Sequence, residues 1–407
     1  MSSWLEDFLD STKELESPRR YFYWAMLATI SSVVGKRMWV DRGGAYKLYP
    51  NVYVFIISKR SGLRKSIPVS IAKKLAYDCG RVRVIDGQNT IQGVLKELGK
   101  VKTLPSKHII KNAEGFLITG EFASFLLQDG TSTALTTLTD LYDTHAHDSG
   151  FKKTLASQDV IELKSPCLTS LYASNLTHFF DAVPRNAITG GFLARTFCIY
   201  EEKRNTINSL TTKNKNKIDF ARILTHLDAI SKLEGEIIPD AGANKAFHDW
   251  YVDFCSKDHE EDDETGTSER IGDNIWKAAM LIALANSHFH TITVEDMEEA
   301  IDKTLVTFSD IKRILTGGSS DNKNIKSITM RTVVASILET DPAFEIGRKK
   351  LLRKGVGIFG VHDLDEILEH LLQAGMLKQD KRGPEVYYKL TDLIIKKHTE
   401  MKGRTIN

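Results

Sequence analysis

The chain has 407 residues, of which 42% are hydrophobic and 27% are charged. This composition is typical of a globular protein, and the length allows two or three domains with a sizeable core. The formal net charge is only +2, which excludes a basic surface over the whole chain, so any surface for nucleic acid must be local.

The start of the chain predicts where the protein is found. Glu6 and Asp7 make the N-terminus acidic, so we expect no signal peptide. The longest apolar runs are too short to cross a bilayer, and we expect no membrane partner. The four cysteines are scattered without a CxxC pair, which predicts neither a zinc site nor a disulfide framework. These features together favour a cytoplasmic location.

Residues 1–48 are expected to form a helical N-terminal region. Trp4, Phe8 and Leu9 recur at helical spacing, and residues 21–30 form a second, strongly apolar helical pattern. Two short strands are expected after them, around a Gly-Gly turn. The aromatic residues of this region are best explained by packing.

A strand, a polar loop and a helix are expected between Tyr49 and Asp78. Residues 52–57 form a continuous β-branched and aromatic run, which is typical of a strand buried on both faces. The loop that follows is polar, and the next helix opens on Lys65 and Ser66. This is the setting of a P-loop, in which backbone N–H groups and a helix N-terminus hold phosphates. Lys65 would reach the β- and γ-phosphates of ATP, and the Ser66 hydroxyl would bind Mg²⁺.

The loop departs from the usual pattern G-x-x-x-x-G-K-S/T. Lys59 and Arg64 occupy its two glycine positions, and Gly62 is the only glycine in the loop. The loop tolerates this if Lys59 and Arg64 keep a negative φ. The alternative is a basic surface turn between a strand and a helix. The residues predicted to contact the nucleotide from this loop are Ser61, Gly62, Leu63, Arg64, Lys65 and Ser66.

Four more strands are expected downstream, with helical patterns between them. The strands are predicted at residues 82–86, 116–119, 168–173 and 195–200, and the helices at residues 90–98, 122–127 and 135–142. Strands that alternate with helices predict an α/β core over residues 49–205, with a mostly parallel sheet covered on both faces. Ligands bind such sheets at the carboxyl ends of the strands, and the polar residues described next are all expected there.

Glu121 follows the strand predicted at residues 116–119. In a P-loop ATPase the strand beside the loop ends in acids, of which one helps to hold Mg²⁺ and a Glu orients or deprotonates the attacking water. Glu121 fits the second role, but Gly120 stands where the Mg²⁺-holding Asp is expected. Phosphates, water and Ser66 would then complete the Mg²⁺ shell. The alternative for Glu121 is a first-turn acid of the next helix.

Three more residues are candidates for the site, each with a structural alternative. Asn175 could contact the γ-phosphate or the attacking water, or it could cap the next helix. Arg195 follows a Gly-rich turn and could be a finger that completes a neighbouring subunit's site, or a structural ion-pair residue. Arg270 could contact phosphates from a helical lid, or it could be a solvated charge at a helix end.

One loop gathers several residues of types that bind metals. It contains Asp143, His145, His147 and Asp148. These residue types can ligate a metal, but loop histidines at this spacing are more often polar surface, which is the preferred explanation. Mg²⁺ bound with ATP is therefore the only metal expected.

The rest of the chain predicts a helical region and a separate C-terminal domain. Residues 206–315 are polar and helical, as in a lid, and residues 316–327 have the composition of a linker. From residue 328 to residue 407 the order of helix, helix, helix, strand and strand predicts a winged helix. Its third helix, residues 363–370, is acidic, although a helix that reads the major groove normally carries Lys or Arg.

Six short stretches within residues 4–315 together carry a resemblance to a known family. They are Tyr49-Pro-Asn-Val-Tyr-Val, Ser61-Gly-Leu-Arg-Lys-Ser66, Gly115-Phe-Leu-Ile-Thr-Gly-Glu121, Leu141-Tyr-Asp143, Ser174-Asn175 and Gly190-Gly-Phe-Leu-Ala-Arg195. In these stretches the chain resembles an uncharacterised domain family of phage and mobile-element proteins related to primase-helicases. That family is similar to the AAA+ and superfamily 3 hexameric helicases, and its loop is similar to the one found here.

The resemblance implies a P-loop NTPase core that uses ATP and Mg²⁺. It implies an ATPase role for Lys65, Ser66 and Glu121. It also implies a sensor role for Asn175 and a finger role for Arg195. On this basis we expect a ring-forming, ATP-driven DNA helicase or translocase that serves phage or mobile-element replication, in the host cytoplasm if a phage encodes it.

Such an enzyme implies several partners. ATP bound between subunits predicts a closed homo-oligomeric ring, expected to be a hexamer. Single-stranded DNA would pass through a channel lined by basic loops, for which residues 99–111 and 145–164 are candidates. The alternative for both stretches is an ordinary solvated loop. The chain starts almost directly at the ATPase module, so a primase or polymerase, if one is used, would be a separate polypeptide.

A different class of function also fits the sequence. The protein could be an ATP-driven loader or remodelling switch that acts on partner proteins, with the winged helix as a protein-interaction module. The acidic third helix favours this alternative, because the basic residues of the domain lie elsewhere and suit phosphate contacts at most. A third possibility is an ATP-binding structural subunit.

Overall fold

The structure is a computed structural model. It describes residues 4–59, 61–87, 89–129, 131–143, 150–154, 160–183, 191–208, 217–257, 265–340, 343–354, 361–383, 385–392 and 395. Its contacts divide the chain into two compact units, Met1–Ile314 and Leu315–Asn407. Each unit has its own hydrophobic core, so each is described by itself.

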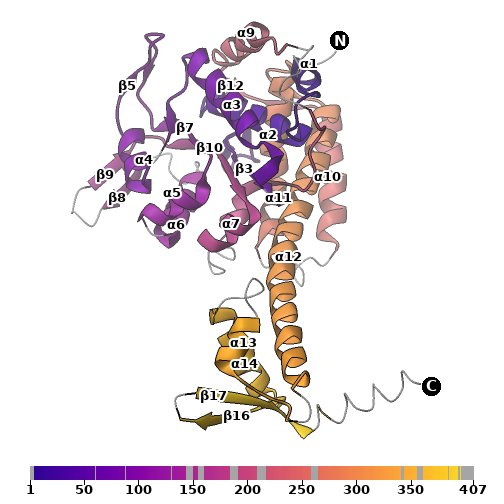
Figure 1. Ribbon diagram of the computed structural model, residues 1–407. Coiled ribbons are helices and arrows are strands. Elements are labelled where there is room, and N and C mark those ends of the chain that lie inside the picture. The colour runs from indigo at the N-terminus through magenta and orange to yellow at the C-terminus, as the bar shows by residue number, and fades with distance from the viewer. Residues whose placement is uncertain are drawn as a thin grey trace. The chain divides into compact units, whose positions relative to one another are not determined.

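A five-stranded, all-parallel sheet forms the centre of the first unit, in the order β11-β3-β10-β7-β4 (Figure 1). Its strands are β3 (Tyr53–Ser58), β4 (Val84–Asp86), β7 (Glu114–Thr119), β10 (Cys167–Asn175) and β11 (Thr196–Glu201). All six residues of β3 are buried, as its continuous apolar run predicts. The α/β core and all five predicted strands are therefore confirmed.

Helices cover both faces of this sheet because alternate residues of a strand point to opposite sides. Val54 and Ile56 belong to the core that includes α2 (Arg19–Val34) and α3 (Ser66–Cys79). Phe55 points the other way, where its ring lies 4.7 Å from Phe122 and 5.3 Å from Phe179. These two rings belong to α5 (Phe122–Asp129) and α7 (Leu176–Ala182), near α6 (Thr131–Tyr142).

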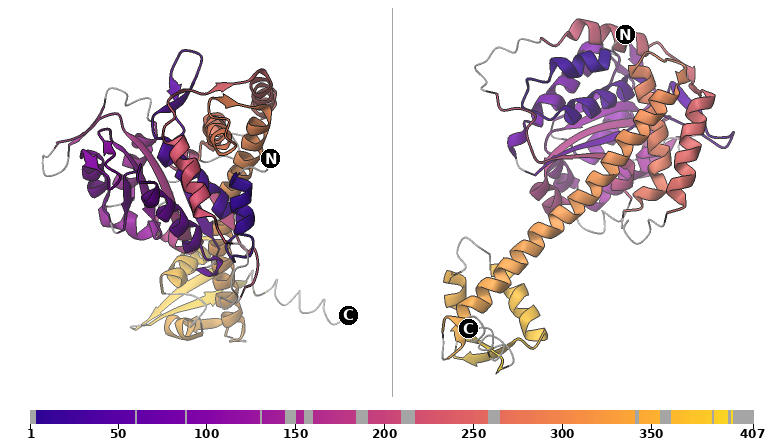
Figure 2. Two further views of the ribbon diagram at one scale, coloured as in Figure 1. Left: turned by 90° about the horizontal axis from the view of Figure 1, so that it is seen from above. Right: turned by 90° about the vertical axis from the view of Figure 1, so that its right-hand side faces the viewer.

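Helix α2 is almost completely buried and fixes the strand ends. Its Trp24 ring stacks on Phe197 of β11 at 4.6 Å. The Tyr21 hydroxyl donates to the Ile57 carbonyl over 2.7 Å, at the end of β3. Helix α1 (Trp4–Ser11) packs beside α2, and both are the indigo helices against the sheet in Figure 2 (right). The expected helical N-terminal region is thus present, and it packs directly on the sheet.

The remaining elements of the first unit are helices and short strands. The helices are α4 (Ile91–Leu98), α9 (Phe220–Ile230), α10 (Ala241–Cys255), α11 (Thr267–Ala285) and the first part of α12 (Val294–Leu338). The short strands are β1 (Met38–Asp41), β2 (Lys47–Leu48), β12 (Gly235–Glu236), β13 (Ile238–Pro239) and β14 (Thr291–Ile292). A reciprocal cap opens α12, in which Thr293 N–H donates to Asp296 and Asp296 N–H donates to the Thr293 hydroxyl.

Both stretches predicted as channel loops contain an antiparallel hairpin. Strands β5 (Lys102–Thr103) and β6 (Ile109–Ile110) pair within residues 99–111. Strands β8 (Phe151–Thr154) and β9 (Val160–Leu163) pair within residues 145–164. Residues 144–149 and 155–159 lie outside the described part of the chain.

The second unit carries a small antiparallel sheet in the order β15-β17-β16. Its elements are the end of α12, β15 (Glu345–Gly347), α13 (Arg348–Lys354), α14 (Val361–Gln373), β16 (Leu377–Arg382) and β17 (Glu385–Leu390). The predicted order of helices followed by two strands is present, with the additional strand β15. None of the described helices in either unit is both long and apolar enough to cross a membrane.

Residues 316–327, predicted to be a linker, follow the boundary between the two units at Leu315, but they are helical. These residues lie within the continuous helix α12. Composition predicted a break, since each Gly in a helix costs about 1 kcal/mol relative to Ala. The helix continues because flanking helical segments already provide the nucleus, and each added residue then gains a backbone hydrogen bond.

Candidate functional site

Three strand ends meet where β3 enters the predicted phosphate loop. Ser58, the last residue of β3, pairs with Asn175 of β10 on one side and with Glu201 of β11 on the other. The Lys59 N–H continues this pattern by donating to the Glu201 carbonyl over 3.3 Å. The loop therefore starts between two neighbouring strands at the sheet's carboxyl edge, where a ligand of a parallel sheet binds.

Lys65 folds back over the end of β3. The loop forms a short 3-10 turn, Ser61–Leu63, before α3 begins at Ser66. The Lys65 ammonium donates to the buried Ser58 hydroxyl over 2.5 Å. Burial lowers the pKa of Lys65, and the Glu121 carboxylate opposes this shift through its charge. The structure thus brings Lys65, Ser66 and Glu121 together at one edge.

The conformation of Arg64 differs from the prediction. Arg64 has a φ of 52°, so the condition of a negative φ, under which the loop was predicted to tolerate this residue, is not met. This left-handed conformation costs a residue other than Gly about 1–2 kcal/mol. Contacts with the N-terminal region hold it, because Arg64 Nε donates to Glu16 over 2.8 Å and the Ser17 hydroxyl donates to the Arg64 carbonyl over 2.9 Å.

Glu16 also binds a second arginine beside the loop. Its other oxygen accepts from Arg204, which follows β11, over 2.7 Å. A Cβ at Gly62 would lie 3.3 Å from an Arg204 nitrogen, so the loop glycine passes close to this side chain. The hydrogen bond from Arg64 and the charges of Arg64 and Arg204 lower the pKa of Glu16. The sequence contains no signal for this clamp, because its residues come from three distant segments.

A cavity of about 400 Å³ lies beside the first turns of α3. Its polar lining includes Ser66, Lys73, Asp86, Glu121, Ser124 and Gln128. Asp86, which ends β4, forms an ion pair with Lys73 and accepts a hydrogen bond from Tyr77 over 3.0 Å. Burial alone would raise the pKa of Asp86, but these two donors outweigh burial and lower it. The carboxylate therefore stays charged at the wall of the cavity.

Asp86 was not among the predicted site residues, although the same pattern identified Glu121. Each acid lies at the carboxyl end of a short hydrophobic strand, with Asp86 as the last residue of β4 and Glu121 just after β7. At Gly120, where an acid was expected, an added Cβ would have nothing within 4 Å. A larger residue would fit there, so crowding does not explain the glycine.

Glu121 follows a strand that does not neighbour the loop strand. Strand β10 lies between β3 and β7, so the expectation that Glu121 ends the strand beside the loop was wrong. The order of parallel strands depends on how the connections cross the sheet, which local patterns do not specify. Asn175 therefore ends the intervening strand, between the strand of Lys65 and the strand of Glu121.

Asn175 caps helix α7. Its side-chain oxygen accepts from the His178 N–H over 2.8 Å, and its amide nitrogen lies 3.1 Å from the His178 ring. The structural alternative for Asn175 is thus realised. Its position beside Ser58 also leaves it next to Lys65, so capping and a role toward phosphate are compatible.

Arg195 lies at the opposite edge of the sheet. Thr196 begins β11 and pairs with Tyr53, the first residue of β3. The expectation that all candidate residues lie at carboxyl ends was therefore wrong for Arg195, because a residue that enters a parallel strand lies at the amino edge. Arg195 is nearly buried and donates to Asp143 over 2.7 Å and to the Gly191 carbonyl over 3.1 Å.

Arg270 lies with Arg195 and not with the phosphate loop. It donates to the other oxygen of Asp143 over 3.2 Å. Burial alone would raise the pKa of Asp143, but the hydrogen bond from Arg195 and the charges of both arginines lower it. Arg270 therefore lies at the amino edge with Arg195, away from the loop at which the phosphates were expected.

A buried lysine lies next to this pair of arginines. Lys277 is on α11, and its ammonium donates to Asn51 Oδ1 over 2.8 Å and to the Asn51 carbonyl over 3.1 Å. It also lies 3.7 Å from the centre of the Tyr142 ring. Burial lowers the pKa of Lys277 to about 7. The amino edge of the sheet thus has its own polar cluster, around Asp143.

Only part of the loop that was considered for a metal lies within the described residues. His145, His147 and Asp148 lie outside the described residues, and Asp143 is bound to the two arginines. In the part of the chain that the structure describes, no group of three or more His, Cys, Asp or Glu residues is placed to hold a metal ion.

In comparisons with known proteins, no family model matches the chain, and no curated protein matches it.

Proposed function

We propose that the protein is a P-loop ATPase that forms a ring and moves along single-stranded DNA, in the replication of a phage or mobile element. The observation that carries this proposal is the position of Lys65. It lies at the end of β3, an inner strand of the sheet, beside Ser66 and within reach of the Glu121 charge. A basic surface turn would instead place such a lysine in solvent.

The order of the strands supports the same chemistry. With β10 between β3 and β7, Asn175 stands between the strand that leads to Lys65 and the strand that leads to Glu121. A group that senses the γ-phosphate or orients the attacking water is needed between those two residues. This is the AAA+ or superfamily 3 helicase-like arrangement that we propose for the core.

The residues present fit ATP with Mg²⁺. The loop N–H groups and the start of α3 would bind the phosphates, and Lys65 would neutralise their charge. Ser66 would hold Mg²⁺, with waters and phosphate oxygens as further ligands, and the ion would offset the charge that develops during phosphoryl transfer. Glu121 would orient or deprotonate the attacking water.

The arginines at the amino edge support a ring. Strand β3 has six residues, so about 20 Å separates the two edges of the sheet, and Arg195 and Arg270 do not reach the phosphate loop of their own chain. A finger at this edge can serve only a neighbouring subunit. We propose a closed ring, with hexamers as the expected form.

The two hairpins are the proposed contacts to single-stranded DNA. Lys102 of β5 and Lys152 and Lys153 of β8 lie on them. Lys102 pairs with Glu97 and Lys152 with Glu162, so part of this charge is already neutralised within the chain. We therefore expect contacts to be weak for each subunit and to add up around a ring.

The test is ATP hydrolysis by the purified protein, with and without single-stranded DNA. Strong stimulation by DNA is the expected result. Hydrolysis that responds only to a partner protein would favour the alternative, a loader or remodelling switch. Absence of hydrolysis under all conditions would reject both and favour an ATP-binding structural subunit.

One observation favours the alternative function, a loader or remodelling switch that acts on partner proteins. In the second unit, which we propose to be a winged helix, Arg348 pairs with Asp365 of α14 through contacts of 2.7 and 2.8 Å. Arg382 likewise pairs with Glu345 over 2.7 and 2.9 Å. Basic residues that are bound to acids of their own unit contribute little to holding a phosphate backbone, so this unit also suits a protein partner.

A further inference from the structure

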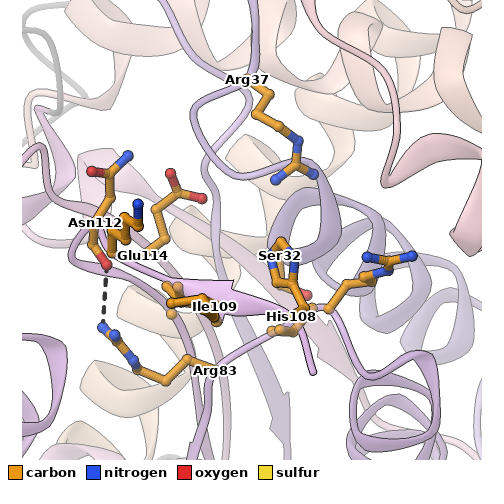
Figure 3. Close-up of a pocket in the computed structure, with 12 residues that line it drawn as sticks. Ser32, Arg37, Arg83, His108, Ile109, Asn112 and Glu114 are labelled. Atoms are coloured by element: carbon orange, nitrogen blue, oxygen red, sulfur yellow. Dashed lines mark hydrogen bonds between the residues drawn. The ribbon is translucent and has the colours of Figure 1, made fainter. Parts of the chain in front are cut away.

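A second cavity lies at the amino edge of the sheet, away from the phosphate loop. It has a volume of about 220 Å³ and lies between the segment after α2, the base of the β5–β6 hairpin and the starts of β4 and β7. Figure 3 shows Arg37, Ser32, His108 and Glu114 around this space, with Arg83 at its wall. No function proposed above uses this cavity.

The lining of the cavity is strongly basic. Arg37, Arg81, Arg83 and Lys111 all line it, whereas Glu114 is its one carboxylate. Among the described residues, Arg37, Arg83 and Lys111 form no ion pair with any carboxylate, and Arg81 reaches only Asp228, at 3.5 Å. Three of the four cations are therefore not neutralised by a direct ion pair with a described carboxylate.

Arg83 is the most deeply buried of these cations. It is only 1% exposed, and its guanidinium donates to three backbone carbonyls, those of Leu98, Lys100 and Asn112. Its Nε has no hydrogen-bond partner, and the buried Nε of Arg37 has none either. Burial lowers the pKa of Arg83, and the charges of Glu97 and Glu114 oppose this shift, but neither carboxylate forms an ion pair with the guanidinium. An anion at this wall would therefore stabilise it further.

Burial and the same positive charges shift the pKa of His108. Burial, followed by the positive charges of Arg81 and Arg37, lowers the pKa of His108, and Glu114 only partly opposes the shift. The imidazole therefore experiences a net positive environment in spite of the nearby carboxylate. The Asn112 amide is a neutral donor in the lining, whereas the Ser32 hydroxyl already donates to the Thr29 carbonyl over 2.7 Å.

We propose that this cavity is a binding site for a phosphate group. Guanidinium groups bind phosphate through two parallel hydrogen bonds, and several arginines around one small space fit a group with several charged oxygens. The phosphate could be a free phosphate or pyrophosphate, or a phosphodiester of a nucleic acid. The site does not depend on the proposed ATPase, because the phosphate loop lies at the other edge.

The test is calorimetric titration of the full-length protein with inorganic phosphate, pyrophosphate and a short oligothymidylate. A Lys65→Ala background weakens the phosphate loop, so that the second site is measured by itself. In this background, Arg81→Gln combined with Lys111→Gln should weaken binding about tenfold or more, since two charge-assisted contacts are lost. Lys96→Gln is the matched control, because Lys96 is exposed on α4, lies outside both hairpins and does not line the cavity.

Weakened binding of phosphate or pyrophosphate would support a site for free phosphates. Weakened binding of the oligothymidylate alone would support a site for phosphodiesters. Equal behaviour of the double variant and the Lys96→Gln control with every ligand would overturn the proposal. A second measurement needs no variant at this site, since a bound anion must raise the pKa of His108, which NMR follows directly; an unchanged pKa at saturating ligand would equally reject it.

Discussion

Ser58 ends the strand before the loop and Lys65 follows the loop, and the Lys65 ammonium donates to the Ser58 hydroxyl over 2.5 Å. This contact holds the ammonium at the end of β3, an inner strand of the sheet. If the loop binds phosphate as we propose, a phosphate oxygen would compete with the Ser58 hydroxyl for this ammonium.

The first prediction concerns this lysine. In Lys65→Ala, ATP turnover should fall by about 10²-fold or more, because a preorganised charge that stabilises the transition state is lost. Lys59→Ala, which removes an exposed lysine from the same loop, should retain turnover. Thermal melting should show that both variants fold. Near-normal turnover of Lys65→Ala would remove the assignment of the loop.

The second prediction tests whether Arg195 acts on a neighbour. Arg195→Ala should lower turnover by about 10³-fold, as expected for a finger supplied by another subunit. Mixing it with Lys65→Ala should restore part of the activity, since some interfaces then pair an intact loop with an intact finger. Arg222→Ala, which breaks only an exposed pair with Asp7, is the control. If mixtures that co-assemble stay inactive, Arg195 does not act in trans.

The third prediction concerns stability and pH at Lys277. Its pKa is about 7 in the folded protein and about 10.4 in an unfolded chain. Between these values the unfolded state binds more protons, so this residue makes the free energy of unfolding rise with pH, by at most about 1.4 kcal/mol per pH unit. Lys277→Met should remove that rise, whereas Lys245→Met, at an exposed position, should not.

The free energies of unfolding of the wild type and of Lys277→Met must be compared with each other at each pH, because other groups also contribute to the pH dependence. Burial raises the pKa values of Cys167 and Cys198, and this acts with the opposite sign, because these thiols stay protonated in the folded state after they ionise in the unfolded one. Urea unfolding at pH 7, 8 and 9 would give the difference directly. An equal pH dependence of wild type and Lys277→Met would show that Lys277 keeps an ordinary pKa.

The fourth prediction concerns residues 328–407. They contain the second hydrophobic core, from Val333 and Ile337 to Leu390, and should fold by themselves. Because Arg348 and Arg382 are bound to acids, this part should bind DNA weakly, without sequence preference, and with a strong dependence on salt. Fluorescence anisotropy over a range of salt concentrations tests this. Tight, sequence-specific binding at high salt would contradict it.

The strands were predictable because each is a short apolar run that is buried as a whole. Strand β3 is the clearest case, since all six of its residues are buried, and helix α3 follows from the apolar spacing after Ser66. The position of Lys65 and Glu121 at one edge also followed, because both come after parallel strands.

The remaining features depend on contacts between distant residues. The insertion of β10 between β3 and β7 comes from crossover connections, and the left-handed Arg64 depends on Glu16, far away in the chain. Arg195 was placed at the wrong edge because a sequence pattern marks a strand, but the direction in which a flanking residue enters or leaves it must be considered separately. The cavity at Arg83 has no local signature at all.

The Glu16 clamp sets a limit on how far the chain can be shortened from its N-terminus. A version that starts at Tyr49 would keep every strand of the central sheet but would lose α2, which covers one face of it. It would also leave Arg64 and Arg204 side by side at the loop without the carboxylate that now separates their charges. Repulsion between the two guanidinium groups would then push apart the loop and the segment after β11. The smallest unit that preserves this loop therefore begins ahead of Glu16, well before the first strand of the sheet.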